Sequence, residues 1–222
     1  MSLDLRLLML PGMGADARLF KDQIARFPNL QIPDWVEPLT NESLRSYASR
    51  FARVIDPGVP CIIGGASFGG IVALEMATHL KSVACVLIGS IRTPAELSWR
   101  WRVMRPLALL GPDKLASSAK LIASIPWLGE GMVRRLSRLA RPESAFARWA
   151  TCAVLRWQPS PLQGVQIFQL HGEFDHILPA RNTRADTIVP GGSHALSLFN
   201  PSAVNDYLAS VMQSVRVCSN CS

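Results

Sequence analysis

Gly65-Ala66-Ser67-Phe68-Gly69 is the stretch that decides the fold of this chain of 222 residues. The apolar residues 59–64 before it predict a buried strand, and residues 68–80 after it predict a helix. A G-x-S-x-G sequence between a strand and a helix is typical of a sharp turn that presents its serine as a nucleophile. Side chains two positions from Ser67 would collide in so tight a turn, which explains glycine at both places. A glycine-rich phosphate-binding turn is the alternative, but neither G-x-x-x-x-G-K-[ST] nor G-x-G-x-x-G occurs in the sequence.

Outward from this turn, apolar runs alternate with amphipathic stretches along most of the chain. Such alternation with short connections predicts an α/β fold, in which helices flank a mostly parallel central sheet of about six strands. Pro33 removes a backbone donor from one predicted strand, so we expect that strand at an edge of the sheet. The predicted strands are residues 5–10, 30–37, 59–64, 83–88, 165–170 and 184–189, and the predicted helices are residues 16–27, 42–55 (capped by Asn41), 68–80 and 201–212.

Residues 91–160 break this rhythm. Prolines and glycines divide them into several helical stretches, with no convincing strand. They carry twelve Lys and Arg against four Asp and Glu, whereas the remainder of the chain carries eleven against twelve. Five of the six tryptophans also lie here, at positions 99, 101, 127, 149 and 157. We therefore predict a core made of residues 1–90 and 161–222, with a basic helical insertion at residues 91–160.

Composition narrows the class of protein. Hydrophobic residues make up 49% of the chain and charged residues 18%, which excludes a disordered chain. Five cysteines in 222 residues do not make a disulfide scaffold. Cys218 and Cys221 form a C-x-x-C, but a zinc site needs about four ligands and no second pair lies nearby. We expect a frayed tail with two thiols.

The sequence predicts neither a membrane span nor an export signal. Residues 57–74, between Asp56 and Glu75, are uncharged, yet prolines and glycines interrupt them in a way that fits a strand, a turn and a helix. The first residues place Asp4 and Arg6 around a short leucine-rich run, without a basic leader or a small-residue cleavage site. We expect a protein that stays in the cytoplasm.

A serine nucleophile needs a base, and the base needs an acid that orients it. His194 is the best candidate base, because it lies in a glycine-rich loop between the last predicted strand and the terminal helix. Asp175 follows the preceding predicted strand and is the best acid, with Glu173 as the competing acid. Ser67, Asp175 and His194 each follow a predicted strand, where open α/β sheets place their sites. The other three histidines have plainer expected roles: His79 at a helix end, and His171 and His176 in hydrogen bonds near the acid.

A tetrahedral intermediate also needs donors for its negative oxygen. We expect one donor to be the backbone N–H of Phe68, the residue after the nucleophile. The loop Pro11-Gly12-Met13-Gly14 leaves the first predicted strand, and the N–H of Met13 is our candidate for the second donor. Gly12 lets the main chain approach the substrate there. The plain alternative for such a loop is a turn with no role in binding.

The chain resembles the α/β-hydrolase superfamily over essentially all of its length, through the motifs LPGMGAD (10–16), GGASFGG (64–70), HGEFDHILP (171–179) and GGSHALSLFNP (191–201). The resemblance implies the α/β-hydrolase fold, with residues 91–160 as a helical lid between the sixth and seventh strands in the family's order. Two departures matter: the chain begins at the family's third strand, without the usual first hairpin, and Pro11 replaces the histidine of a His-Gly pair found in many relatives. Serine at position 67 excludes the dehalogenase branch, whose nucleophile is an aspartate.

The resemblance also implies an activity. It points to a serine hydrolase that cleaves a carboxylic ester of a small or medium-chain acyl group through an acyl-enzyme, without a metal or cofactor. A thioesterase acting on CoA or carrier-protein thioesters is the nearest alternative, because esters and thioesters share the same tetrahedral chemistry. A non-catalytic ligand receptor and a cofactor-free perhydrolase are the remaining alternatives within the superfamily.

The predicted insertion bears on the substrate. Its aromatic and aliphatic residues, including Trp99, suggest an apolar acyl pocket, although most of its tryptophans can simply pack helices on the sheet. Its basic residues, including Arg102, suggest attraction for an anionic group such as an acidic carrier protein, or for an anionic membrane surface, with a solvated charged face as the plain alternative. No recognition motif accompanies the charge, so we expect no nucleic-acid partner. Gly12, Trp99 and Arg102 are the candidate substrate-binding residues.

Overall fold

A computed structural model describes residues 5–108 and 145–219 of the chain. Within these residues six strands form one sheet in the order β2-β1-β3-β4-β5-β6, and every neighbouring pair is parallel. The α/β fold with a parallel sheet of about six strands is therefore confirmed. The strands are β1 (Arg6–Leu10), β2 (Leu30–Gln31), β3 (Cys61–Ala66), β4 (Ser82–Ile88), β5 (Gln166–Gly172) and β6 (Thr187–Val189).

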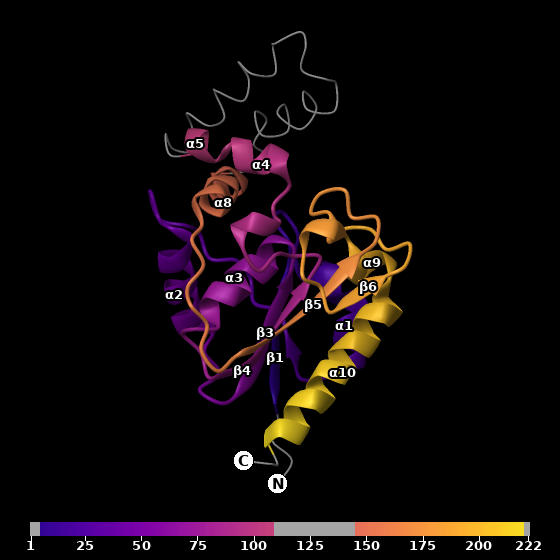
Figure 1. Cartoon of the computed structure of the whole chain (residues 1–222). Coiled ribbons are helices and arrows are strands. Elements are labelled where there is room, and N and C mark those ends of the chain that lie inside the picture. Colours follow the sequence, from indigo (N-terminus) through magenta and orange to yellow (C-terminus); the bar gives the residue numbers. More distant parts are fainter. Residues whose placement is uncertain (1–4, 109–144, 220–222) are drawn as a thin grey trace.

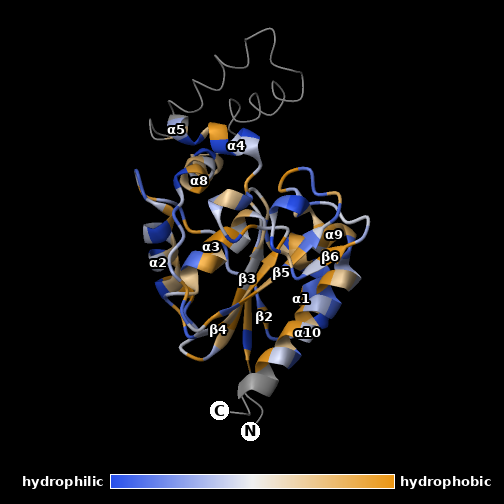
Figure 2. Ribbon diagram, in the orientation of Figure 1, coloured by the Kyte–Doolittle hydropathy of each residue, from blue (hydrophilic) through white to orange (hydrophobic). Residues whose placement is uncertain are grey.

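The central strands are apolar because both faces of the sheet are covered. Every residue of β3 is buried, and the hydrophobic residues concentrate along the strands (Figure 2). A parallel strand buried on both faces has this continuous apolar character. β2 is shorter than the predicted strand 30–37, because Pro33 has no N–H with which to extend the pairing. It lies at the edge of the sheet, as predicted.

Helices cover the two faces of the sheet (Figure 1). One face carries α2 and α3, which together with α8 pack around an apolar cluster that includes Tyr47, Phe51 and Trp149. The other face carries α1, α9 and α10, which pack around a second cluster that includes Phe20 and Leu208. The helices are α1 (Lys21–Arg26), α2 (Leu44–Ile55), α3 (Phe68–Met76), α4 (Trp99–Val103), α5 (Arg105–Ala108), α8 (Ala145–Arg156), α9 (Leu196–Phe199) and α10 (Pro201–Ser219), with short 3-10 turns at Ala17–Phe20, Pro94–Glu96 and Ala180–Asn182.

The start of α2 differs from the prediction. Ser43 is its N-cap, and the Ser43 hydroxyl accepts a hydrogen bond from the N–H of Ser46. Asn41 instead adopts a left-handed conformation with φ of 58°, two residues before the cap. The predicted cap was therefore wrong, because serine and asparagine both favour this position and only the path of the chain decides which residue occupies it.

The described parts of the segment between β4 and β5 (residues 89–108 and 145–165) contain helices and no strand. α8 is attached to the core: the indole N–H of Trp149 donates to the carbonyl of Glu42 at 2.8 Å, and Phe146 packs against Trp35 and Phe68. Trp127 and the pair Cys218–Cys221 lie outside the residues whose side chains are described. In the described part of the chain, no helix is both long and apolar enough to cross a membrane.

Candidate active site

Ser67 occupies the sharp turn between β3 and α3. Its φ of 51° lies in the left-handed region, which is costly for a residue with a side chain. A Cβ on Gly65 would lie 2.7 Å from the carbonyl oxygen of Leu10, and a Cβ on Gly69 would overlap the backbone of Leu10 and Pro11. Only glycine fits either position, as the sequence predicted. The N–H of Ser67 donates to the carbonyl of Ile88 on β4 at 3.0 Å, so the sheet itself holds the turn.

His194 and Asp175 lie beside this serine although they are distant from it in the sequence. The Nε2 atom of His194 is 2.9 Å from the Ser67 Oγ atom, and the Nδ1 atom is 2.7 Å from the Asp175 Oδ2 atom. The His194 side chain is 20% exposed and the Asp175 side chain is fully buried. The structure therefore brings together the three residues predicted as nucleophile, base and acid, in hydrogen-bonding order.

The Asp175 carboxylate is held at both oxygens. Its Oδ1 atom accepts from the backbone N–H groups of Ile177 and Leu178, both at 2.8 Å. Its Oδ2 atom faces His194 and, at 3.1 Å, the Nε2 atom of His171. Burial by itself raises the pKa of Asp175, but the hydrogen bonds from His171 and His194 outweigh it and hold the pKa well below the usual range. The carboxylate is therefore ionised at neutral pH.

The other candidate titratable groups lie apart from the serine. Glu173, the competing acid, is exposed, and its carboxylate accepts from the N–H of Gly191 at 2.8 Å. His79 and His176 are also exposed. Among the described residues, no group of three His, Cys, Asp or Glu side chains could hold a metal ion.

A small apolar pocket opens at Ser67. Its volume is about 100 Å³, and Met13 and Phe68 are among the residues that line it with Ser67. A Cβ on Gly12 would lie 3.7 Å from the Ser67 Cβ atom, so the loop after β1 passes close to Ser67. Within residues 5–108 and 145–219 its lining carries no charged side chain: it consists of Met13, Ser67, Phe68, Ile71, Leu97, Trp101, Thr151, Val154, Leu155, Ile177 and Leu178.

None of the three candidate substrate-binding residues, Gly12, Trp99 and Arg102, is among the residues that line this pocket. Trp99 is 59% exposed and packs against the Arg100 guanidinium, 5.6 Å from the ring centre, and Arg102 is also exposed. Trp101 lines the pocket instead. The reason is helical geometry: successive residues of α4 point about 100° apart, so Trp99 and Trp101 face nearly opposite directions. The presence of both tryptophans in the sequence does not show which of them faces the pocket.

Two residues that support the site were not singled out from the sequence. The Ser90 hydroxyl donates to the carbonyl of Ser67 at 2.6 Å and so helps to hold the strained turn. Gly89 has a φ of 52°, and a Cβ there would lie 2.9 Å from the carbonyl of His194. The available signal was their position: both directly follow β4, whose carboxyl end lies beside that of β3.

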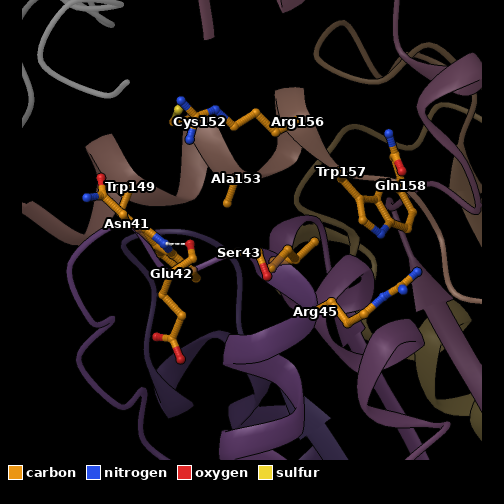
Figure 3. Close-up of a pocket in the computed structure, with 11 residues that line it drawn as sticks. Asn41, Glu42, Ser43, Arg45, Trp149, Cys152, Ala153, Arg156, Trp157 and Gln158 are labelled. Atoms are coloured by element: carbon orange, nitrogen blue, oxygen red, sulfur yellow. Dashed lines mark hydrogen bonds between the residues drawn. The ribbon is translucent and has the colours of Figure 1, made fainter. Parts of the chain in front are cut away.

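A larger cavity of about 310 Å³ lies between the start of α2 and α8 (Figure 3). It shares no lining residue with the pocket at Ser67. Its two arginines do not converge in Figure 3: the Arg156 Nε–H donates to the carbonyl of Ala108, whereas Arg45 lies toward Glu75, 4.0 Å from its carboxylate. The cavity therefore offers no built site for an anion.

Comparisons with known proteins agree with this architecture. A model of the alpha/beta hydrolase family matches residues 6–207, whereas no curated protein matches the chain in sequence. A thermophilic esterase structure is 18% identical, with a TM-score of 0.62 over 96% of this chain and 91% of that one. An epoxide hydrolase from Bacillus megaterium is 12% identical, with a TM-score of 0.64 over 94% and 93%. The RedJ thioesterase of prodiginine biosynthesis in Streptomyces coelicolor is 16% identical, with a TM-score of 0.56 over 93% and 84%.

These three identities are low, so the structural likenesses speak for the fold alone. The family match covers most of the chain, including the turn at Ser67 and the loops that carry Asp175 and His194. The chain belongs to the alpha/beta hydrolase family.

Proposed function

We propose that this protein is a serine hydrolase that cleaves esters of short, uncharged acyl groups. The observation that carries the proposal is the chain of hydrogen bonds from the Ser67 Oγ atom through His194 to Asp175, at 2.9 and 2.7 Å, at the edge of an apolar pocket. A serine hydroxyl is a weak nucleophile until a base accepts its proton, and this arrangement supplies the base.

The geometry assigns the tautomer of His194. Its Nδ1 atom lies 2.7 Å from an ionised carboxylate, so this nitrogen carries the proton and the Nε2 atom is the acceptor that faces Ser67. His194 takes the serine proton as Ser67 attacks the acyl carbonyl, then returns it to the leaving group. Asp175 stays ionised throughout and stabilises the imidazolium. A water molecule, activated by the same histidine, releases the acid from the acyl-enzyme.

The backbone N–H groups of Met13 and Phe68 are the donors that we assign to the tetrahedral oxyanion. Two observations support this assignment. Both residues line the pocket that contains Ser67, and Phe68 is the first residue of α3, whose N-terminal backbone N–H groups have no partner within the helix. Because Gly12 lies close to Ser67, the loop after β1 is near enough for the Met13 N–H to contribute to the oxyanion site.

The pocket determines the substrate class that we propose. Its volume is only about 100 Å³, and we infer from this small size that it accepts a short acyl chain. Burying a carboxylate or ammonium in a lining without charged groups would be costly. The side chains of Val154 and Leu155, on α8, form the wall that would limit chain length.

A thioesterase is the second candidate, and one observation favours it. Arg100 and Arg102 are exposed on α4 on both sides of Trp101, which lines the pocket. Positive charge is thus placed close to where a leaving group would lie, and it would attract the phosphates of CoA or an acidic carrier protein.

The role of residues 91–160 as a lid stays a prediction, and so does the cytoplasmic location of the protein.

The first experiment is labelling by a fluorophosphonate probe, which reacts with activated serines. We expect the wild type to be labelled and Ser67→Ala to be inert, with Ser46→Ala, an exposed serine of α2, as the matched control. Labelling that survives in Ser67→Ala would remove this serine from the mechanism. A wild type that is not labelled would favour the ligand receptor.

The second experiment sorts the substrate. The rate with p-nitrophenyl esters should fall steeply once the acyl chain exceeds a few carbons, and Leu155→Ala should shift the optimum to longer chains. Acyl-CoA thioesters are assayed beside these esters. If the double variant Arg100→Gln, Arg102→Gln loses thioester turnover but keeps ester turnover, the thioesterase becomes the better assignment.

A further inference from the structure

His171 lies directly behind the acid of the candidate site and is fully buried. It belongs to β5 and reaches Asp175 four residues later in the chain, in the loop that follows this strand. Its Nε2 atom lies 3.1 Å from the Asp175 Oδ2 atom and 2.5 Å from the carbonyl oxygen of Leu178. The Oδ2 atom of Asp175 is thus shared by two imidazoles, that of His194 and that of His171.

The neighbours of His171 decide where its proton lies. Both groups near Nε2 are acceptors, so Nε2 must carry a hydrogen. The Nδ1 atom is buried and has no hydrogen-bond partner. A second proton there would leave an unpaired charged donor in the protein interior, which is far more costly than an unpaired lone pair. His171 is therefore the neutral tautomer with its hydrogen on Nε2.

We propose that His171 is a positioning residue, which fixes the Asp175 carboxylate so that its Oδ2 atom is presented to His194 in one orientation. The inference rests on the proposed function, since it assigns a role within that site. Two backbone N–H groups already hold the Oδ1 atom, and His171 supplies the additional contact that holds Oδ2. Without His171, the two backbone N–H groups would still hold the Oδ1 atom, but the Oδ2 atom would be held by His194 alone.

A hydrogen bond from a neutral donor also withdraws negative charge from the carboxylate. Removing this donor leaves more charge on the Oδ2 atom and strengthens its hold on the His194 imidazolium. The neutral form of His194, which the reaction needs, then begins to dominate only at higher pH. Among the described residues, the polar groups that contact the His171 ring are the Asp175 carboxylate and the Leu178 carbonyl.

The test compares His171→Phe with His171→Gln, using the short-chain ester as substrate. A hydrogen bond to a charged group contributes about 1.5–3 kcal/mol, so we expect His171→Phe to lower kcat by about 10- to 150-fold while KM changes by less than about threefold. The acidic limb of the kcat/KM profile should move to higher pH by about half a unit or more. Gln can donate from a similar position, so His171→Gln should recover most of both effects.

A double-mutant cycle separates positioning from general damage to the fold. If His171 acts through Asp175, the variant His171→Phe, Asp175→Asn should be as slow as Asp175→Asn alone, within about twofold. A further loss in the double variant would overturn the proposal, as would a His171→Phe variant with wild-type kcat and an unmoved acidic limb. Should His171→Phe fail to fold, His171→Asn replaces it, because Asn is polar but too short to reach Oδ2. Fluorophosphonate labelling of the wild type tests the proposed function independently of all these variants.

Discussion

Asp175 and Glu75 are both buried carboxylates, yet the donors that surround them differ in kind. Asp175 lies at the carboxyl end of the sheet between two imidazoles and two backbone N–H groups. Glu75 lies on α3, eight residues after Ser67, and accepts from the indole N–H of Trp157 at 2.7 Å and from the N–H and hydroxyl of Ser160 at 2.8 and 2.6 Å.

The difference teaches how this fold uses buried charge. The donors of Glu75 are neutral and do not titrate near neutral pH, and they come from the chain that leads from α8 back to β5. Glu75 thereby attaches this part of the segment between β4 and β5 to α3, the helix that begins directly after Ser67. Asp175 instead lies against two imidazoles as well as two backbone N–H groups. Burial of a carboxylate alone therefore does not mark a catalytic acid; the identity of its donors does.

The largest expected effect is that of Asp175→Asn. The amide cannot stabilise the imidazolium and favours the wrong tautomer of His194, so we expect kcat to fall by about 10⁴-fold. Steady-state hydrolysis of the short-chain ester measures this, with Glu173→Gln as the matched control, since Glu173 is the exposed acid two residues away. Equal losses in the two variants would contradict the assignment of the acid.

Glu75→Gln should have the opposite pattern of effects: a loss of stability with little loss of activity. The amide loses acceptor capacity for Trp157 and Ser160, so we expect the free energy of unfolding to fall by about 1–3 kcal/mol. Activity of the folded protein should stay within about threefold of wild type. Urea unfolding measures the first quantity and ester hydrolysis the second. A loss of activity comparable to that of Asp175→Asn would break the distinction between the two carboxylates.

Lowering the pH should distinguish the two buried carboxylates in a second way. The pKa of Asp175 is lowered in the folded protein, so this group contributes stability above the unfolded-state pKa of about 3.9, and this stability is lost as the pH falls toward the lower folded-state value. The stability advantage of the wild type over Asp175→Asn should therefore be constant from pH 7 to about pH 5 and shrink below about pH 4. Urea unfolding at several pH values tests this, and an advantage that grows on acidification would reverse the sign.

Trp157→Phe tests one of the donors to Glu75. It removes one buried donor to Glu75 and some packing, at a cost of about 1–3 kcal/mol in the free energy of unfolding. In Glu75→Gln the same replacement should cost less, because the partner is already altered. Trp99→Phe, at an exposed position, should change stability by less than about 0.5 kcal/mol. Equal effects at the two tryptophans would show that the contact with Glu75 contributes little.

The sequence by itself was sufficient for the fold class and for the three residues of the hydrogen-bonded chain. Local patterns carry this information: an uninterrupted apolar run predicts a buried parallel strand, and two glycines around Ser67 predict the turn. Because parallel strands end at one edge of a sheet, Asp175 and His194 could be assigned to that edge from their positions after two predicted strands.

Only the tertiary structure decided which neighbouring side chain faces which partner. Trp101 rather than Trp99 lines the pocket, Ser43 rather than Asn41 caps α2, and His171 lies 3.1 Å from the Asp175 carboxylate. Glu75 finds its donors 82 and 85 residues further along the chain. These outcomes depend on the rotation of short helices and on contacts between segments that are distant in sequence. A local pattern predicts the element on which a residue lies, but the direction of its side chain and its partners follow only from the packing of the whole chain.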